Sequence, residues 1–347
     1  MKAAESIQDY DYHLPPSLIA QEPCEPRDAA RLLLLKRENG SLSHLQFQEF
    51  PNLLKPEDCL VFNDTRVHPA RIHARKVKGG GAVEILLLRR LAAGLWRVLV
   101  RGSGISLGSE LQLQSSKDPL LAVVTAVGEG GQRDLQFAKP ILDRLPELGE
   151  VPLPPYIQSP LTDPERYQTI YGNKLGSAAA PTAGLHFTHQ TFLALKDKGV
   201  ITAYCTLHIG LDTFQPIRVN DIAEHTMHSE SIELGHETAA AIQRCRAAGG
   251  RVFAIGTTTA RVLETAAQNS AAHTVISPYQ GETRLFIRPG YAWRVVDALL
   301  TNFHLPRSTL LLMVSAFAGR ETILRTYEVA VRERYRFYSF GDAMLIL

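Results

Sequence analysis

The stretch AAGGRVFAIGTTTARVLE, residues 247–264, predicts the end of one helix, a short strand and the start of another helix. Residues 237–248 are predicted to be helical, and the pair Gly249-Gly250 ends that helix. The apolar run 251–255 predicts a buried strand, and GTTT at 256–259 leads into the second helix. This succession is typical of an α/β fold.

The same alternation continues on both sides of this stretch. Residues 192–195 predict a helix that Gly199 ends, and the run 201–209 predicts a buried strand. The apolar run 60–62 predicts a further strand, and residues 323–331 have apolar side chains at helical spacing. We therefore expect a main α/β domain with a mixed sheet or barrel.

Residues 72–137 have a different pattern. Together with the run that precedes them, they contain roughly six short strand-like runs separated by glycines and polar turns, with no long helical period. This pattern predicts a small all-β module, roughly a six-stranded barrel. Prolines at 152, 154 and 155 mark the return to the main domain. The expected domains are a main domain of 1–71 and 151–347 and an inserted barrel of 72–150.

The composition restricts the class of protein. The chain has 347 residues, of which 45% are hydrophobic and 21% charged, which fits a globular protein of about two domains. A net charge of +2 neither requires nor excludes nucleic acid. The four cysteines have no CxxC spacing, so we expect no disulfide and no thiolate zinc site. The N-terminus lacks a signal core and no run is long enough for a membrane span, so we expect a cytoplasmic protein.

Four polar clusters follow predicted strands, where α/β proteins place ligands. In the first, Asn63-Asp64-Thr65-Arg66, the carboxylate suits a hydroxyl or amine and the guanidinium a phosphate or carboxylate; a helix cap or turn is the alternative. The second, APTAGLHFT at 180–188, combines small residues that allow close approach of a ligand with His186, an acid, a base or a structural histidine.

The other two clusters lie further along the chain. EHTMHSE at 224–230 places carboxylates around His225 and His228, which suits proton transfer, contacts to a base, or a metal if His208 or His186 adds a ligand. GTTT at 256–259 offers amides and hydroxyls at a helix start as an anion cradle, without the lysine of a P-loop.

Two groups of basic residues are consistent with contact to RNA, and a solvated surface is the alternative reading of each. Arginines alternating with aromatic rings suit phosphate contact and base stacking. The first group is Arg66, Arg71, Arg75, Lys76 and Lys78, and the second is Arg332, Arg334 and Arg336 beside Tyr335, Phe337 and Tyr338.

Taken together, these strings resemble the S-adenosylmethionine:tRNA ribosyltransferase-isomerase family of queuosine biosynthesis. The similarity runs almost from end to end, in the order of the family's own strings. It is carried by DYDY at 9–12, VFNDTRV at 61–67, PLPPYI at 152–157, the clusters at 180–188, 224–230 and 256–258, VDALLTNFHLP at 296–306 and GDAM at 341–344.

The resemblance implies a specific reaction. The ribosyl part of S-adenosylmethionine is transferred to the aminomethyl group of 7-aminomethyl-7-deazaguanine at the tRNA wobble position and rearranged to give epoxyqueuosine, with release of adenine and methionine. It also implies an α/β domain with an inserted β-barrel. S-adenosylmethionine is then a co-substrate and the tRNA anticodon loop the partner. We expect a monomer with no metal, no permanently bound cofactor and no membrane contact.

The implied chemistry assigns roles to the polar clusters. The sulfonium acidifies the adjacent C5′ proton, so the reaction needs a general base with a pKa near neutrality. A ring such as Phe187 or Phe214 is expected to face the sulfonium. The residues expected to be catalytic are His186, Asp64, His225, His228 and Glu230. Those expected to bind substrate are Asn63, Thr65, Arg66, Thr182, Gly184, Phe187, His208, Phe214, Gly256, Thr257, Thr258, Asn302 and His304.

Four positions depart from the family pattern, namely Asp212, Ser231, Arg284 and Arg288. They leave the identity of the acceptor open. Three other readings remain: a related enzyme with the same donor and another acceptor, a metal-dependent hydrolase built on the histidines, and a non-catalytic RNA-binding protein.

Overall fold

The computed structural model describes residues 6–114, 118–210 and 219–347. The chain forms two compact units, each with its own hydrophobic core. The first unit comprises Met1–Thr65, Pro155–Lys174 and Ala180–Leu347, and the second comprises Arg66–Pro154 and Leu175–Ala179.

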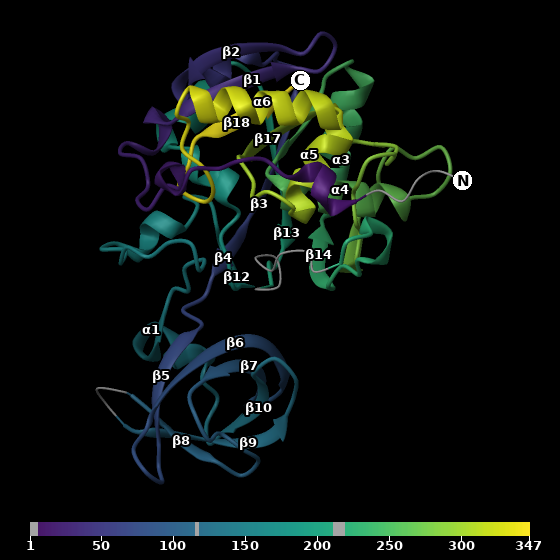
Figure 1. Cartoon of the computed structure of the whole chain (residues 1–347). Coiled ribbons are helices and arrows are strands. Elements are labelled where there is room, and N and C mark those ends of the chain that lie inside the picture. The colour runs from purple at the N-terminus through teal and green to yellow at the C-terminus, as the bar shows by residue number, and fades with distance from the viewer. Residues whose placement is uncertain (1–5, 115–117, 211–218) are drawn as a thin grey trace. The chain divides into compact units, whose positions relative to one another are not determined.

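A mixed sheet forms the centre of the first unit, with nine strands among the described residues (Figure 1). The strands β13, β3, β15 and β17 are neighbours and run parallel, so their carboxyl ends lie on one edge of the sheet. In sheet order the strands are β16 (Tyr279–Thr283), β14 (Glu230–Leu234), β13 (Ile201–Leu207), β3 (Cys59–Asn63), β15 (Val252–Ile255), β17 (Ala298–Asn302), β18 (Ala343–Ile346), β1 (Arg31–Lys36) and β2 (Ser41–Gln46).

Helices cover this sheet. The helix α4 contacts β13, β14, β15, β3, β16 and β17 and is buried along nearly its whole length. The helices α5 and α6 pack against each other. The helices of this unit are α2 (His189–Asp197), α3 (His236–Ala247), α4 (Thr257–Gln268), α5 (Thr309–Ala318) and α6 (Arg320–Arg332). Within the described ranges, none is both long and apolar enough to cross a bilayer.

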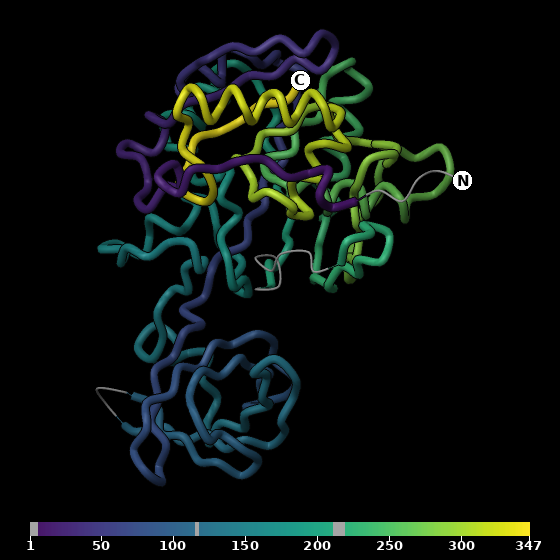
Figure 2. The backbone as a smooth tube through the Cα atoms, viewed as in Figure 1, coloured from purple at the N-terminus to yellow at the C-terminus, as the bar shows by residue number. Residues whose placement is uncertain are grey.

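The second unit is a closed antiparallel barrel, which can be followed in Figure 2. The ring closes because β8 pairs with both β9 and β5, and side chains alternate between its core and its surface. In ring order the strands are β5 (Arg71–Lys76), β6 (Ala82–Ala92), β7 (Leu95–Arg101), β10 (Gln132–Phe137), β9 (Leu120–Val127) and β8 (Glu110–Leu113), with β11 (Gly149–Glu150) paired to β5 outside the ring and α1 (Leu145–Leu148) before it. The predicted α/β fold with a roughly six-stranded barrel is confirmed.

The remaining two strands, β4 (Thr65–Val67) and β12 (Lys174–Ser177), pair with each other and contain points where the chain passes between the units.

Phe187 lies in the core of the first unit. Its side chain is fully buried, and its ring meets those of Phe62 and Phe47 edge to face at 4.9 and 5.1 Å between centroids. The expectation that this ring faces a bound sulfonium is therefore wrong, because four aromatic neighbours occupy its surroundings.

A conservative change tests this packing role. The variant Phe187→Leu is expected to lower the free energy of unfolding by about 1–2 kcal/mol, because the edge-to-face contacts and part of the buried ring are lost. Leu193→Ala, at an exposed position of α2, is the control and should stay within about 0.5 kcal/mol. Denaturant titration measures both, and an unchanged Phe187→Leu would contradict the packing described.

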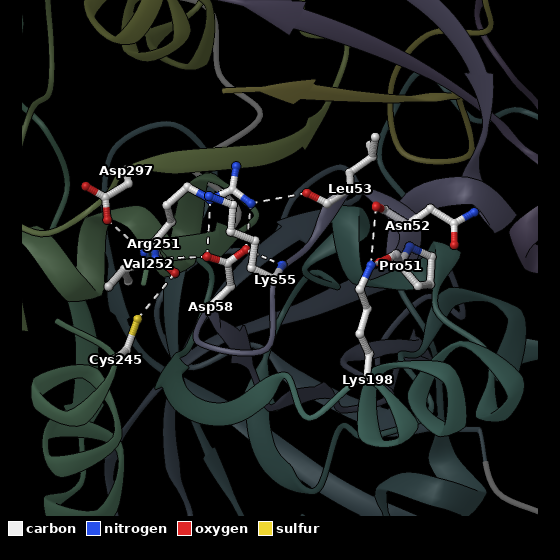
Figure 3. A network of polar contacts seen from close by, with 10 residues as sticks. All are labelled: Pro51, Asn52, Leu53, Lys55, Asp58, Lys198, Cys245, Arg251, Val252 and Asp297. Atoms are coloured by element: carbon white, nitrogen blue, oxygen red, sulfur yellow. Dashed lines mark hydrogen bonds and ion pairs between the residues drawn. The ribbon is translucent and has the colours of Figure 1, made fainter. Parts of the chain in front are cut away.

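At the amino ends of β3 and β15, the edge opposite the polar clusters, an ion pair joins the two strands (Figure 3). The carboxylate of Asp58 is fully buried and lies 2.6 Å from Nη2 of Arg251. It also accepts hydrogen bonds from the backbone amides of Lys55 and Arg251, at 2.8 and 2.9 Å. Each carboxylate oxygen is thus hydrogen-bonded within the protein.

Candidate active site

The carboxyl edge of the parallel strands gathers residues from two of the four polar clusters, together with His208 and Asn302. Asn63 and Asp64 follow β3, His208 follows β13, Thr257 begins α4 after β15, and Asn302 ends β17. The structure thus brings together, at one edge, residues that lie up to 239 positions apart in the sequence.

Asn63 holds this edge together. It is fully buried, and its amide nitrogen donates to the carbonyl of Leu207 and to Oγ1 of Thr258, each at 3.1 Å. Its oxygen accepts from the backbone amides of Leu207 and Thr65 at 3.0 and 3.2 Å. The side chain therefore positions β3, β13 and α4 relative to one another.

Asp64, Thr65 and His208 form the first polar group of the edge. Oδ1 of Asp64 accepts from Oγ1 of Thr206 at 2.7 Å, and Oγ1 of Thr65 lies 2.8 Å from Nδ1 of His208. Burial raises the pKa of Asp64, and the Thr206 hydrogen bond opposes this shift. Burial lowers the pKa of the half-buried His208, which favours its neutral form, able to accept a proton.

His228, Glu230 and Arg261 form the second group. Glu230 is 3% exposed; its Oε1 lies 3.3 Å from Nε2 of His228 and accepts from the amide of Gly210 at 3.2 Å. Its Oε2 is paired with Nη1 of Arg261, which α4 carries and which is 5% exposed. Burial lowers the pKa of Arg261 to about 10. Arg261 remains charged at neutral pH, and Glu230 is held between a guanidinium and an imidazole.

A pocket lies beside this second group. It contains about 310 Å³ of empty space, part of it open to solvent. The ring of His225 packs against that of Phe286 in its wall, 5.3 Å between centroids, and burial lowers the pKa of His225, with His228 adding to the shift. The pocket is lined by Met227, His228, Arg261, Leu285, Phe286, Ile287, Thr309, Leu310 and Met313.

His186 and Asn302 form a third, more deeply buried group. Nε2 of His186 lies 3.4 Å from Nδ2 of Asn302, whose oxygen accepts from Oγ1 of Thr182 at 2.9 Å. Burial lowers the pKa of His186 to about 4, so this imidazole is neutral at pH 7 and a weak base. It lines a second pocket together with Arg27 and Arg166, with about 260 Å³ of empty space, part of it open to solvent.

His304 belongs to the support of the edge. Its Nε2 lies 2.8 Å from Oγ1 of Thr301, and its backbone amide donates to Oη of Tyr327 at 3.0 Å. Burial lowers its pKa to about 3. These contacts hold the backbone and the imidazole of His304 in place within the protein.

Two glycines expected to bind substrate meet protein atoms. A Cβ on Gly184 would lie 1.9 Å from Oη of Tyr171, so close packing requires glycine there. Gly256 precedes α4 with a φ of 92°, a conformation that glycine adopts without strain.

The remaining predicted residues lie elsewhere. Arg66 belongs to the second unit, and Phe214 and the departure Asp212 lie outside the described residues. The departure Ser231 is exposed on β14, where its carbonyl accepts from the amide of His208 at 3.1 Å. The departures Arg284 and Arg288 flank the pocket wall 285–287.

The interpretation of the C-terminal aromatic residues as a stacking surface for RNA is wrong. Tyr335 and Phe337 are fully buried and Tyr338 is 5% exposed. Arg336 donates from its backbone amide to Asp342 at 2.8 Å and from its guanidinium to the carbonyl of Glu22. This segment leads into β18 through the core, so its rings are not available to bases.

Arg261 lies on the helix that follows the GTTT cluster, but it was not among the residues expected to bind substrate or to be catalytic. The signal available was a pair of charged residues, Arg261 and Glu264, inside a helix whose other side chains are uncharged. Among the described residues, no three histidines, cysteines or carboxylates come together as ligands for a metal ion.

Comparisons with known proteins agree with one another. The family model described as queuosine biosynthesis protein matches residues 7–346. A curated S-adenosylmethionine:tRNA ribosyltransferase-isomerase of Moorella thermoacetica is 51% identical over 345 residues, 98% of this chain and 99% of that protein. A crystal structure of S-adenosylmethionine tRNA ribosyltransferase from Thermotoga maritima is 41% identical, with a TM-score of 0.57, and the match covers 98% of this chain and 100% of that one.

Proposed function

This chain belongs to the family of queuosine biosynthesis proteins, and we propose from that membership that it is an S-adenosylmethionine:tRNA ribosyltransferase-isomerase. It transfers the ribosyl part of S-adenosylmethionine to 7-aminomethyl-7-deazaguanine at the tRNA wobble position and isomerises it, so that epoxyqueuosine forms and adenine and methionine leave. The main support for this assignment is the 51% identity with the Moorella thermoacetica enzyme over 98% of this chain.

The first proton transfer of this reaction is assigned to His228. The sulfonium acidifies the C5′ proton, and a histidine paired with a carboxylate is a suitable base. The 3.3 Å contact between Nε2 of His228 and Oε1 of Glu230 supports this role, because a ring that donates through Nε2 accepts a proton at Nδ1. His186 also lines a pocket, but burial lowers its pKa to about 4, so it is a weak base at neutral pH.

Asp64, Thr65 and His208 are assigned to the ribose and to the incoming amine. Their carboxylate, hydroxyl and imidazole suit a polyol and a protonated amine. The contact between the carbonyl of Ser231 and the amide of His208 supports placing this group next to Glu230, since Ser231 follows Glu230 on β14.

The partner is tRNA, and the base at the wobble position has to leave the stack of the anticodon loop before it can react. S-adenosylmethionine is a co-substrate and no permanently bound cofactor is proposed. We propose that the protein is a monomer and acts in the cytoplasm, where both substrates occur. Sedimentation of the purified protein tests the monomer.

The assay of the function uses purified protein, S-adenosylmethionine and tRNA carrying 7-aminomethyl-7-deazaguanine. Chromatography with mass detection is expected to find adenine and epoxyqueuosine in equal amounts, and none with tRNA that has guanine at the wobble position. Donor binding without modified tRNA would favour a related enzyme with another acceptor, and Arg284 and Arg288 would be examined next. Absence of donor binding would leave the RNA-binding alternative.

A further inference from the structure

Within the part of the chain that the structure describes, one buried donor of Arg261 has no partner. Nη1 is paired with Glu230, and Nε donates to the carbonyl of Leu285 at 3.2 Å. Nη2 is buried, and no hydrogen-bond acceptor reaches it among the described residues. Leaving a buried charged donor unpaired is unfavourable, so a ligand that offers this atom an acceptor would be bound more tightly.

The same helix contains a matched contrast in Glu264. Oε1 of Glu264 accepts from the backbone amides of Val295 and Val296, each at 3.0 Å. Oε2 accepts from Oη of Tyr291 and the amide of Arg294, each at 2.9 Å. Within α4, therefore, both carboxylate oxygens of Glu264 have hydrogen-bond donors, whereas Nη2 of Arg261 has no acceptor among the described residues.

The surroundings of Arg261 define the chemistry of the missing acceptor. The pocket beside it is mostly apolar, with Leu285, Phe286, Leu310 and Met313 in its wall. One guanidinium facing an apolar pocket fits a carboxylate on a short apolar chain. Arg284 and Arg288, next to the wall in sequence, add positive charge that favours an anion.

We propose that Nη2 of Arg261 binds the carboxylate of the methionine portion of S-adenosylmethionine, with the methionine chain against Leu310 and Met313. This inference rests on the function proposed above. Glu230 already offsets the charge of Arg261. The ligand itself carries an ammonium and a sulfonium besides its carboxylate, and the ring of Phe286 in the pocket wall suits the sulfonium. The C5′ carbon is bonded to that sulfur, and His228 lines the same pocket.

Two ligands test the inference on the unaltered protein. Calorimetry or equilibrium dialysis compares S-adenosylmethionine with decarboxylated S-adenosylmethionine, which keeps the sulfonium, the ribose and the adenine. The protein is expected to bind the decarboxylated compound about 10- to 100-fold more weakly, because a charge-assisted hydrogen bond from Arg261 is lost.

A variant assigns that difference to Arg261. Arg261→Lys keeps a cation opposite Glu230 but lacks the second guanidinium nitrogen, and it is expected to bind the two ligands with nearly equal affinity. The control Arg246→Lys, in an ion pair of 2.9 Å with Asp297 outside the pocket, should discriminate as the unaltered protein does. If Arg261→Lys does not fold, the comparison of ligands on the unaltered protein still decides.

Three results would overturn the inference. Equal binding of the two ligands by the unaltered protein would refute the carboxylate site and leave the donor reaction intact. If the unaltered protein bound neither ligand, the proposed function would be refuted as well. A loss of tRNA affinity in Arg261→Lys, with unchanged affinity for S-adenosylmethionine, would assign Nη2 to an RNA phosphate instead.

Discussion

Replacing His228 with alanine is expected to lower kcat by about 10²- to 10⁴-fold while the protein still binds tRNA and S-adenosylmethionine. The imidazole contacts the carboxylate of Glu230 and lines the pocket assigned to the donor, where a base for the C5′ proton is needed. The methionine carboxylate is assigned to Arg261, so removal of the imidazole should affect the proton transfer more than the affinity for the donor.

Two other histidines sharpen this test. His236→Ala, at an exposed position that starts α3, is the matched control and should keep full activity. His186→Ala is expected to lower turnover less than His228→Ala, because an imidazole with a pKa near 4 is mostly ineffective as a base. Single-turnover release of adenine measures all three variants. Full activity in His228→Ala, or near-total loss only in His186→Ala, would move the base to another group.

Replacing Asp58 with alanine is expected to lower the free energy of unfolding by about 3 kcal/mol, the largest stability effect that the fold predicts outside the active site. The change removes the acceptor of the Arg251 guanidinium and of two backbone amides at the amino ends of β3 and β15. Arg251 is 31% exposed, so water reaches its guanidinium. The expected loss of unfolding free energy therefore lies at the lower end of the range for breaking a buried ion pair. Denaturant titration measures this loss.

The stability difference between the unaltered protein and Asp58→Ala depends on pH through the pKa of Asp58. Burial raises this pKa, but the hydrogen bonds from Arg251 and from the backbone amides outweigh burial and lower it below the ordinary value. The stabilisation is therefore fully present above about pH 4 and is lost as the pH falls through the folded-state pKa. Glu57→Ala, an exposed neighbour, should change stability by less than about 0.5 kcal/mol at any pH. A difference that grows in acid would contradict the ion pair.

Local patterns in the sequence were sufficient to predict the fold class. A strand followed by Gly256 and a helix needs only an apolar run, a glycine and helical spacing, all within twenty residues. The closure of the barrel followed from short alternating strands with frequent turns. Both features depend on periodicity, which a single sequence contains.

The environment of the site residues depended on contacts between distant segments. His186 and His304 look like candidate bases in the sequence, but burial makes both poorly basic, and periodicity does not report how many segments cover a loop. The pairing of Arg261 with Glu230 joins α4 to β14 across 31 positions. A run of aromatic residues and arginines, such as that around Tyr335, has the same sequence whether its rings face solvent or the core, and here the ring of Tyr335 is buried.

The fate of the C5′ hydrogens during turnover tests the role of His228 as the base. S-adenosylmethionine deuterated at C5′ is incubated with the protein and tRNA carrying 7-aminomethyl-7-deazaguanine, and the mass of the modified nucleoside is measured. We expect epoxyqueuosine to form with loss of deuterium from C5′ to water, because His228 removes one C5′ deuteron before the ribosyl group rearranges. Epoxyqueuosine that retains all of the deuterium would contradict a reaction started by a base at C5′.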